Sequence, residues 1–180
     1  MTALDAGTAP DLADAIEAWR VWRVVPGTGG HQLRSVVKPT LWPRDAPLVA
    51  ECLLGGSLRR RLWRRSPGHD SPSAPCDCGI YGADLGLLGQ YLTPPPMEPT
   101  LARVLGRVLL WGTVVECERG YRASHAYPAA IYVPSDAACD GGRLEELACG
   151  LAGYGVPIEL LIERCLEAPS AVARLVGANL

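Results

Sequence analysis

The sequence has no phenylalanine and only one lysine, Lys38, against 16 arginines in 180 residues. Alanine, glycine, proline, leucine and arginine are abundant instead, as GC-rich codons dictate. The arginine excess therefore does not indicate selection for bidentate contacts. No apolar run approaches the roughly 18 residues that a membrane-spanning helix needs, so no membrane association is expected. The net charge of −2 excludes a protein that binds polyanions with its whole surface.

Familiar catalytic motifs are also missing. The chain contains no G-x-S-x-G elbow, no H-E-x-x-H helix, no Walker loop and no G-x-G-x-x-G loop. The first residues, Met1 to Asp5, show no basic segment followed by an apolar one, so no signal peptide is predicted. We therefore expect a cytoplasmic protein whose seven cysteines are reduced.

Hydrophobic periodicity predicts one domain over residues 1–180, with short elements of both kinds. The clearest signal covers 103–133. Its first segment alternates and is largely apolar on both faces, which predicts a central strand. A turn at 118–120 and a returning segment then indicate a long hairpin. The element order favours an α+β fold, with a mostly antiparallel sheet or small open barrel and with N- and C-terminal helices. Further strands are predicted over 19–25, 33–42 and 48–54, and helices over 11–18, 84–92, 143–151 and from Pro157, with Ile158, Leu161, Ile162 and Cys165 inward.

Three stretches differ from the rest in composition. Residues 1–10 are expected to be flexible, 55–75 to form a long Arg-rich loop, and 143–180 to form a C-terminal helical segment. The loop carries five arginines around Trp63, which could clamp phosphates and stack on a base. A solvated loop fits the acidic total charge better, so nucleic-acid binding is not expected.

Four residues have the chemistry and spacing of metal ligands. Cys52, His69, Cys76 and Cys78 form the pattern C-x16-H-x6-C-x-C. Thiolates with an imidazole suit zinc, which prefers four tetrahedral ligands of this kind. Four protein ligands leave no position for water, so the pattern predicts a structural zinc rather than a catalytic one. The alternative is a strand cysteine with two incidental loop cysteines.

The segment Gly79-Ile80-Tyr81-Gly82-Ala83-Asp84, followed by Tyr91, resembles the G-I-Y-x-A-D segment of poly-ADP-ribose-polymerase-like ADP-ribosyltransferases. The resemblance implies that Tyr81 and Tyr91 stack on nicotinamide and that Glu116 is the catalytic carboxylate. It covers about a dozen residues, and the H-G-[ST] motif that precedes it in that family is missing. The alternative is that both tyrosines are aromatics at the edge of the core.

A longer resemblance connects the chain to an uncharacterised protein family of GC-rich bacteria. It is carried by W-R-V, C-x-C-G-I-Y, G-x-V-x-L-W-G and G-Y-R-A, which here are residues 22–24, 76–81, 106–112 and 120–123. This resemblance implies a discrete family and brings no activity with it.

Two functions follow as hypotheses. The first is a zinc-stapled cytoplasmic module that binds a small ligand or a protein partner. The alternative is an NAD- or nucleotide-dependent transferase of the ADP-ribosyltransferase type. The transferase requires Tyr81, Tyr91 and Glu116 to line one deep cleft with an arginine, whereas the module does not.

Overall fold

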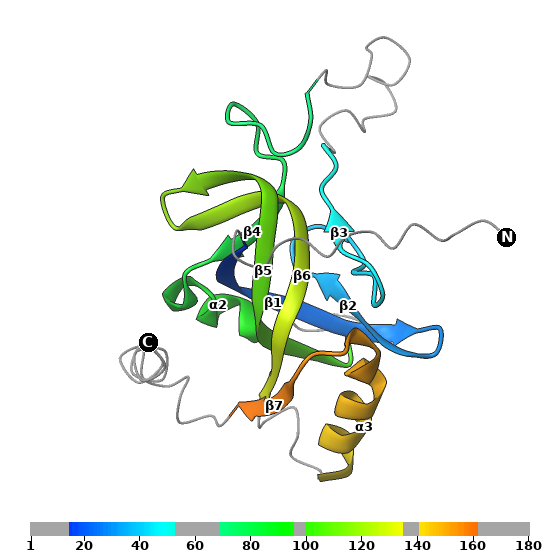
Figure 1. Ribbon diagram of the computed structural model, residues 1–180. Helices are drawn as coiled ribbons and strands as arrows, with labels where there is room; N and C mark the ends of the chain where they lie inside the picture. Colours follow the sequence, from blue (N-terminus) through cyan, green and yellow to red (C-terminus); the bar gives the residue numbers. More distant parts are fainter. Residues whose placement is uncertain (1–14, 53–68, 96–99, 135–140, 162–180) are drawn as a thin grey trace, which may run out of the picture.

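The computed structural model describes residues 15–52, 69–95, 100–134 and 141–161, and one seven-stranded sheet dominates it (Figure 1). The strands are β1 (Ile16–Gly27), β2 (Gly30–Ser35), β3 (Leu48–Val49), β4 (Ile80–Ala83), β5 (Ala102–Cys117), β6 (Gly120–Pro134) and β7 (Ile158–Leu161). The helical elements are η3 (Leu85–Leu87), α2 (Gly89–Leu92), α3 (Gly141–Leu151) and η5 (Ala152–Tyr154). In these segments no helix has the length and apolar character that crossing a membrane requires.

The sheet is mixed, and every described strand pair except β6–β7 is antiparallel. The long hairpin β5–β6 forms its centre, as the alternation over 103–133 predicts. Four strands pair in a closed ring, because β1 pairs with β5, β5 with β6, β6 with β4, and β4 returns to β1 at Trp19 and Ala83. The remaining strands β2, β3 and β7 extend this ring.

Aromatic and β-branched side chains of β1 build the core. Trp22 is fully buried and meets Trp42 edge to face, with ring centroids 5.3 Å apart. Gly106 makes room for Trp22, since a Cβ there would lie 2.6 Å from its ring and 2.2 Å from the carbonyl oxygen of Ala130. Such packing explains why this glycine interrupts an otherwise apolar strand.

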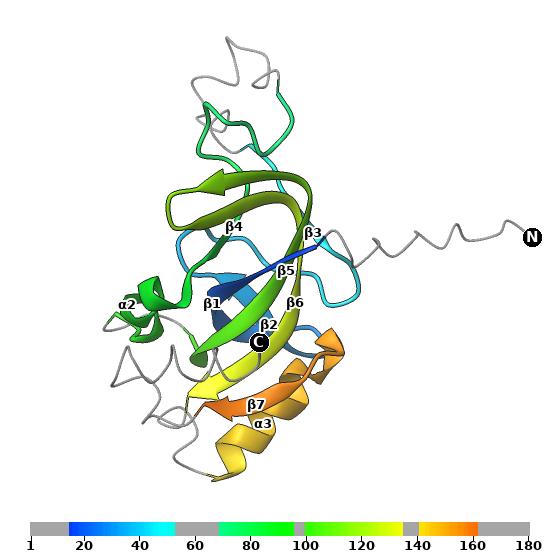
Figure 2. The same ribbon diagram turned by 60° about the vertical axis from the view of Figure 1, so that its left-hand side comes forward.

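Helix α3 closes one end of the sheet, where it packs against β2 and lies beside β7 (Figures 1 and 2). Its buried residues Leu147 and Leu151 join the core. Beyond it, the Tyr154 hydroxyl accepts from the Leu33 amide at 2.8 Å and donates to the Trp42 carbonyl at 2.9 Å. The helix predicted over 143–151 is thereby confirmed.

Two predicted helices are corrected. Residues 16–18, assigned to an N-terminal helix, belong to β1 and pair with β5; the start of that helix lies outside the described residues. Ile158 and Leu161, assigned to a helix from Pro157, form β7 beside β6. The rest of that segment, with Ile162 and Cys165, lies outside the described residues.

Three other predicted elements are shorter than expected. The helix over 84–92 divides into η3 and α2, because two glycines weaken it. The strand over 33–42 ends at Ser35, and the chain returns through Pro39 so that Leu41 bridges back to Arg34. The strand over 48–54 is the two-residue β3.

Candidate metal centre and the cavity beside it

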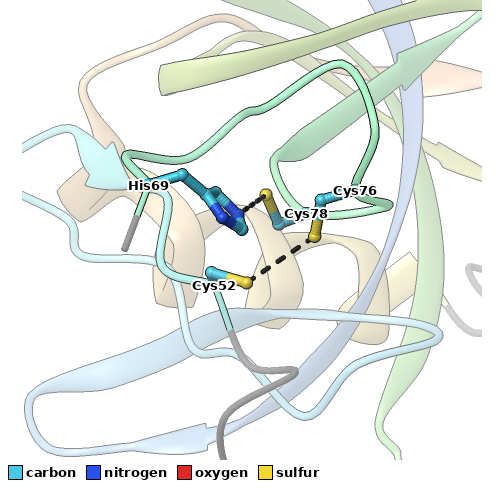
Figure 3. A group of neighbouring side chains, drawn as sticks. All are labelled: Cys52, His69, Cys76 and Cys78. Carbon is cyan, nitrogen blue, oxygen red and sulfur yellow. Dashed lines mark hydrogen bonds between the residues drawn. The ribbon is translucent and has the colours of Figure 1, made fainter. Parts of the chain in front are cut away.

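The four predicted ligands come together between the end of β3 and the start of β4 (Figure 3). Cys52 follows β3, whereas His69, Cys76 and Cys78 belong to the loop that precedes β4. Their donor atoms all lie within 4.8 Å of one another, and the side chains point toward a common centre. The spacing pattern therefore identified a group that the fold assembles from two separate segments.

Two distances within this group match those around a tetrahedral metal. Zn–S bonds of about 2.3 Å and Zn–N bonds of about 2.0 Å at tetrahedral angles place two sulfurs about 3.8 Å apart, and a sulfur and a nitrogen about 3.5 Å apart. The Sγ atoms of Cys52 and Cys76 are 3.7 Å apart, and Cys78 Sγ lies 3.5 Å from His69 Nε2. The residues thus fit a metal ion without rearrangement of these two pairs.

The buried side chain of Arg122 forms hydrogen bonds to the loop that carries Cys76 and Cys78. This residue of β6 donates from Nη1 to the carbonyl oxygens of Cys76 and of Cys78, the latter at 3.0 Å. Its Nε donates to Cys117 Sγ at 3.3 Å, and this hydrogen bond raises the pKa of Arg122. Sequence reasoning missed Arg122, because nothing in its neighbourhood along the chain marks it as a partner of the cysteines.

The positive charge of Arg122 also suits a metal held by three cysteines and a histidine. Three thiolates and a neutral imidazole around Zn²⁺ would leave one net negative charge, and the guanidinium of Arg122 would offset it. Such outer partners orient metal ligands and tune the metal's affinity. Arg122 would therefore give the centre a counter-charge within the fold.

Gly79 lets the chain turn between the centre and β4. Its φ of +123° lies in the region that side chains rarely adopt. A Cβ at this position would also lie 3.0 Å from Cβ of Pro72 and 3.1 Å from Cβ of Arg122. Glycine is therefore required directly after Cys78 for this loop to pack against β6.

The thiols differ in their readiness to ionise. Burial acts to raise the pKa of Cys78, but interactions with Ser71, His69 and Cys76 outweigh it and lower the pKa to about 6. Desolvation raises the pKa of Cys76 above its usual value. Cys78 therefore ionises more readily than Cys76, and the thiolate is the form that binds a metal.

A cavity of about 1000 Å³ lies directly beside this group. Its lining comes from β1, the segment after β2, β3, β4, α2 and the turn between β5 and β6, and most of it is apolar. The stretch 77–83 runs from the metal loop through β4 and forms one wall. The metal centre and the cavity therefore share a segment of chain.

The residues implied by the transferase resemblance divide between two places. Tyr81 and Tyr91 line the cavity, and both rings are exposed to it and to solvent. Glu116 is exposed and lies outside that lining, because neighbouring Cys117, which does line the cavity, points to the other face of β5. The cavity therefore brings the two tyrosines together but not the carboxylate.

The arginines around Trp63 lie outside the described residues. The cysteines away from the centre that the structure describes are Cys117 and Cys149, which are free.

No family model, curated protein or solved structure matches the chain. Both resemblances remain predictions, and the function is argued from the geometry.

Proposed function

We propose that this protein is a zinc-stapled binding module that takes a small ligand into the cavity beside its metal centre. Cys52, His69, Cys76 and Cys78 hold the zinc. The observation that carries the proposal is the match between their Sγ–Sγ and Sγ–Nε2 distances, 3.7 Å and 3.5 Å, and the edges of a zinc tetrahedron. A reducing compartment such as the cytoplasm keeps these thiols available.

The donor set supports zinc in a structural role. Three sulfurs and one ring nitrogen in tetrahedral arrangement are typical of zinc, and four protein ligands complete its coordination. No position is then left for a water that could attack a substrate. The metal accordingly contributes folding free energy.

The zinc would join two segments that pair with β6 through only a few residues. β3 pairs with β6 through two residues, and β4 pairs with β6 through four. The metal joins the end of one segment to the start of the other, so that both walls of the cavity keep their positions. A cavity of this size with an apolar lining favours a small ligand over a protein partner.

Metal analysis tests this proposal directly. Protein purified without chelator is expected to carry about one zinc per chain. Cys76→Ser should lose the zinc and unfold at a lower temperature, whereas Cys149→Ser, a control at an exposed cysteine of α3, should keep it. Stoichiometric zinc in the Cys52→Ser, Cys76→Ser double variant would disprove the assignment.

A further inference from the structure

Arg20 of β1 is a cation on the cavity wall with unused hydrogen-bonding capacity. Its Nη1 donates to the carbonyl oxygen of Tyr81, and its Nη2 donates to Ser35 Oγ at 3.0 Å. Its Nε is buried without an acceptor, and the guanidinium lies 5.0 Å from the ring centroid of Trp42. A guanidinium carries five N–H donors. Because Nε is buried, the donors left for a ligand in the cavity are the second N–H of Nη1 and the second N–H of Nη2, which have no acceptor among the described residues.

The other charged residues of the cavity differ from Arg20 in exposure. Arg20 is partly buried, and among the described residues no carboxylate lies within ion-pair distance of it. Burial lowers its pKa to about 10, so it stays charged at neutral pH. A desolvated cation without a counter-ion attracts an anion more strongly than an exposed one does. The exposed charged residues of the lining are Lys38, Glu51, Asp77, Glu118 and Arg119.

The remaining lining suits a flat apolar body. The lining includes the aromatic residues Trp19, Tyr81 and Tyr91 and the aliphatic residues Leu48 and Leu88. Aromatic rings pack against one another in offset or edge-to-face arrangements that favour planar ligands. The cavity therefore combines aromatic lining residues with one partly buried cation that forms no ion pair with a described residue.

We propose that the cavity binds a flat aromatic monocarboxylate, with the carboxylate on Arg20 and the ring against the tyrosine side of the cavity. This inference rests on the proposed function, since the zinc staple holds the strand that carries Tyr81. One partly buried cation balances a single negative charge. Around the cavity the exposed acidic residues Glu51, Asp77 and Glu118 outnumber the exposed cations Lys38 and Arg119, which disfavours a dianion such as a phosphate ester.

The test compares three ligands of one shape on the zinc-loaded full chain. Calorimetry measures 2-naphthoate, the neutral 2-naphthamide and 2-naphthyl phosphate. We expect the carboxylate to bind at least about tenfold tighter than the amide, which is the effect of a charged hydrogen-bond partner. We expect the phosphate to bind no tighter than the carboxylate. A wild-type protein that binds the amide as tightly as the carboxylate, or none of the three, would overturn the inference.

Variants then locate the anion. Arg20→Met should abolish the preference for carboxylate over amide and leave amide binding within about twofold, while Arg20→Lys should retain the preference because it keeps the charge. Arg119→Met, which removes an exposed cation of the same cavity, should change neither affinity. A preference that survives in Arg20→Met, or is lost equally in Arg119→Met, contradicts the inference.

Zinc content measured on the same samples separates the two proposals. Full zinc with no preference for the carboxylate refutes the ligand class and leaves the staple intact. Absence of zinc refutes the staple itself. Circular dichroism of Arg20→Met shows whether its fold is kept, and if it is not, the wild-type ligand series and Arg20→Lys decide.

Discussion

Replacement of Arg122 tests how the fold holds the metal loop. Arg122→Met keeps the length of the side chain but removes every N–H that reaches Cys76, Cys78 and Cys117. Two carbonyl groups then lose their donor, at a cost of about 1–3 kcal/mol each for a buried group. Since Arg122 is only 6% exposed, solvent replaces few of these contacts. The free energy of unfolding should therefore fall by about 2–6 kcal/mol.

The same variant should weaken the metal site. Loss of an outer partner typically costs 10- to 100-fold in metal affinity, and about that loss is expected here. Competition with a chromophoric zinc chelator at constant pH measures the affinity, and thermal unfolding measures the stability. The zinc affinity of Arg122→Lys should be nearly as low as that of Arg122→Met, because one ammonium group cannot reproduce the planar set of N–H donors of a guanidinium.

Arg107→Met is the matched control. Arg107 lies on the neighbouring strand β5 and forms an exposed ion pair with Glu17 at 3.2 Å. Such a pair contributes at most about 1 kcal/mol, and it is far along the strand from the cysteines. Zinc affinity in Arg122→Met that stays within twofold of the wild type, or that falls equally in Arg107→Met, would refute the argument that Arg122 positions the loop.

Two further substitutions probe the backbone and the core. Gly79→Ala should destabilise the protein by about 1–3 kcal/mol, because Gly79 has a positive φ and close neighbours. Gly86→Ala is the control and should not destabilise it, because a Cβ at Gly86 meets nothing within 4 Å. Equal melting temperatures of the two variants would contradict this. Burial raises the pKa of Tyr154 to about 12, so its contribution to stability is complete below about pH 10 and is lost as the pH rises toward 12. Tyr154→Phe should flatten the fall in unfolding free energy over that interval, and parallel curves for the two proteins would exclude the effect.

The metal group and the central hairpin could be predicted because their signals are local or chemical. Cysteine and histidine have few other roles at such spacing, so Cys52 and His69 stood out although they lie on separate segments. The alternation over 103–133 has the two-residue period of a strand and not the period of a helix. Each of these patterns indicates its structure without knowledge of the rest of the fold.

The ends of the chain and the cavity could not be predicted in this way. Residues from Ile158 onward fit a helical period, and pairing with Ile131 on β6 makes the described part a strand. Nothing in the sequence distinguishes the roles of Arg20 and Arg122. Only the fold shows that Arg20 lines the cavity and that Arg122 contacts the loop of the cysteines. Tertiary neighbours decide these cases.

The closed ring of strands has a consequence for the rate of folding. Ile16 pairs with Leu110, and Ile80 pairs with Ala123, so each link joins distant parts of the chain. Large loops must close before such contacts gain free energy, and topologies of this kind fold slowly. During that time the edges of the long hairpin are unpaired and open to other chains. The arrangement that encloses the core thus makes the nascent chain vulnerable to aggregation.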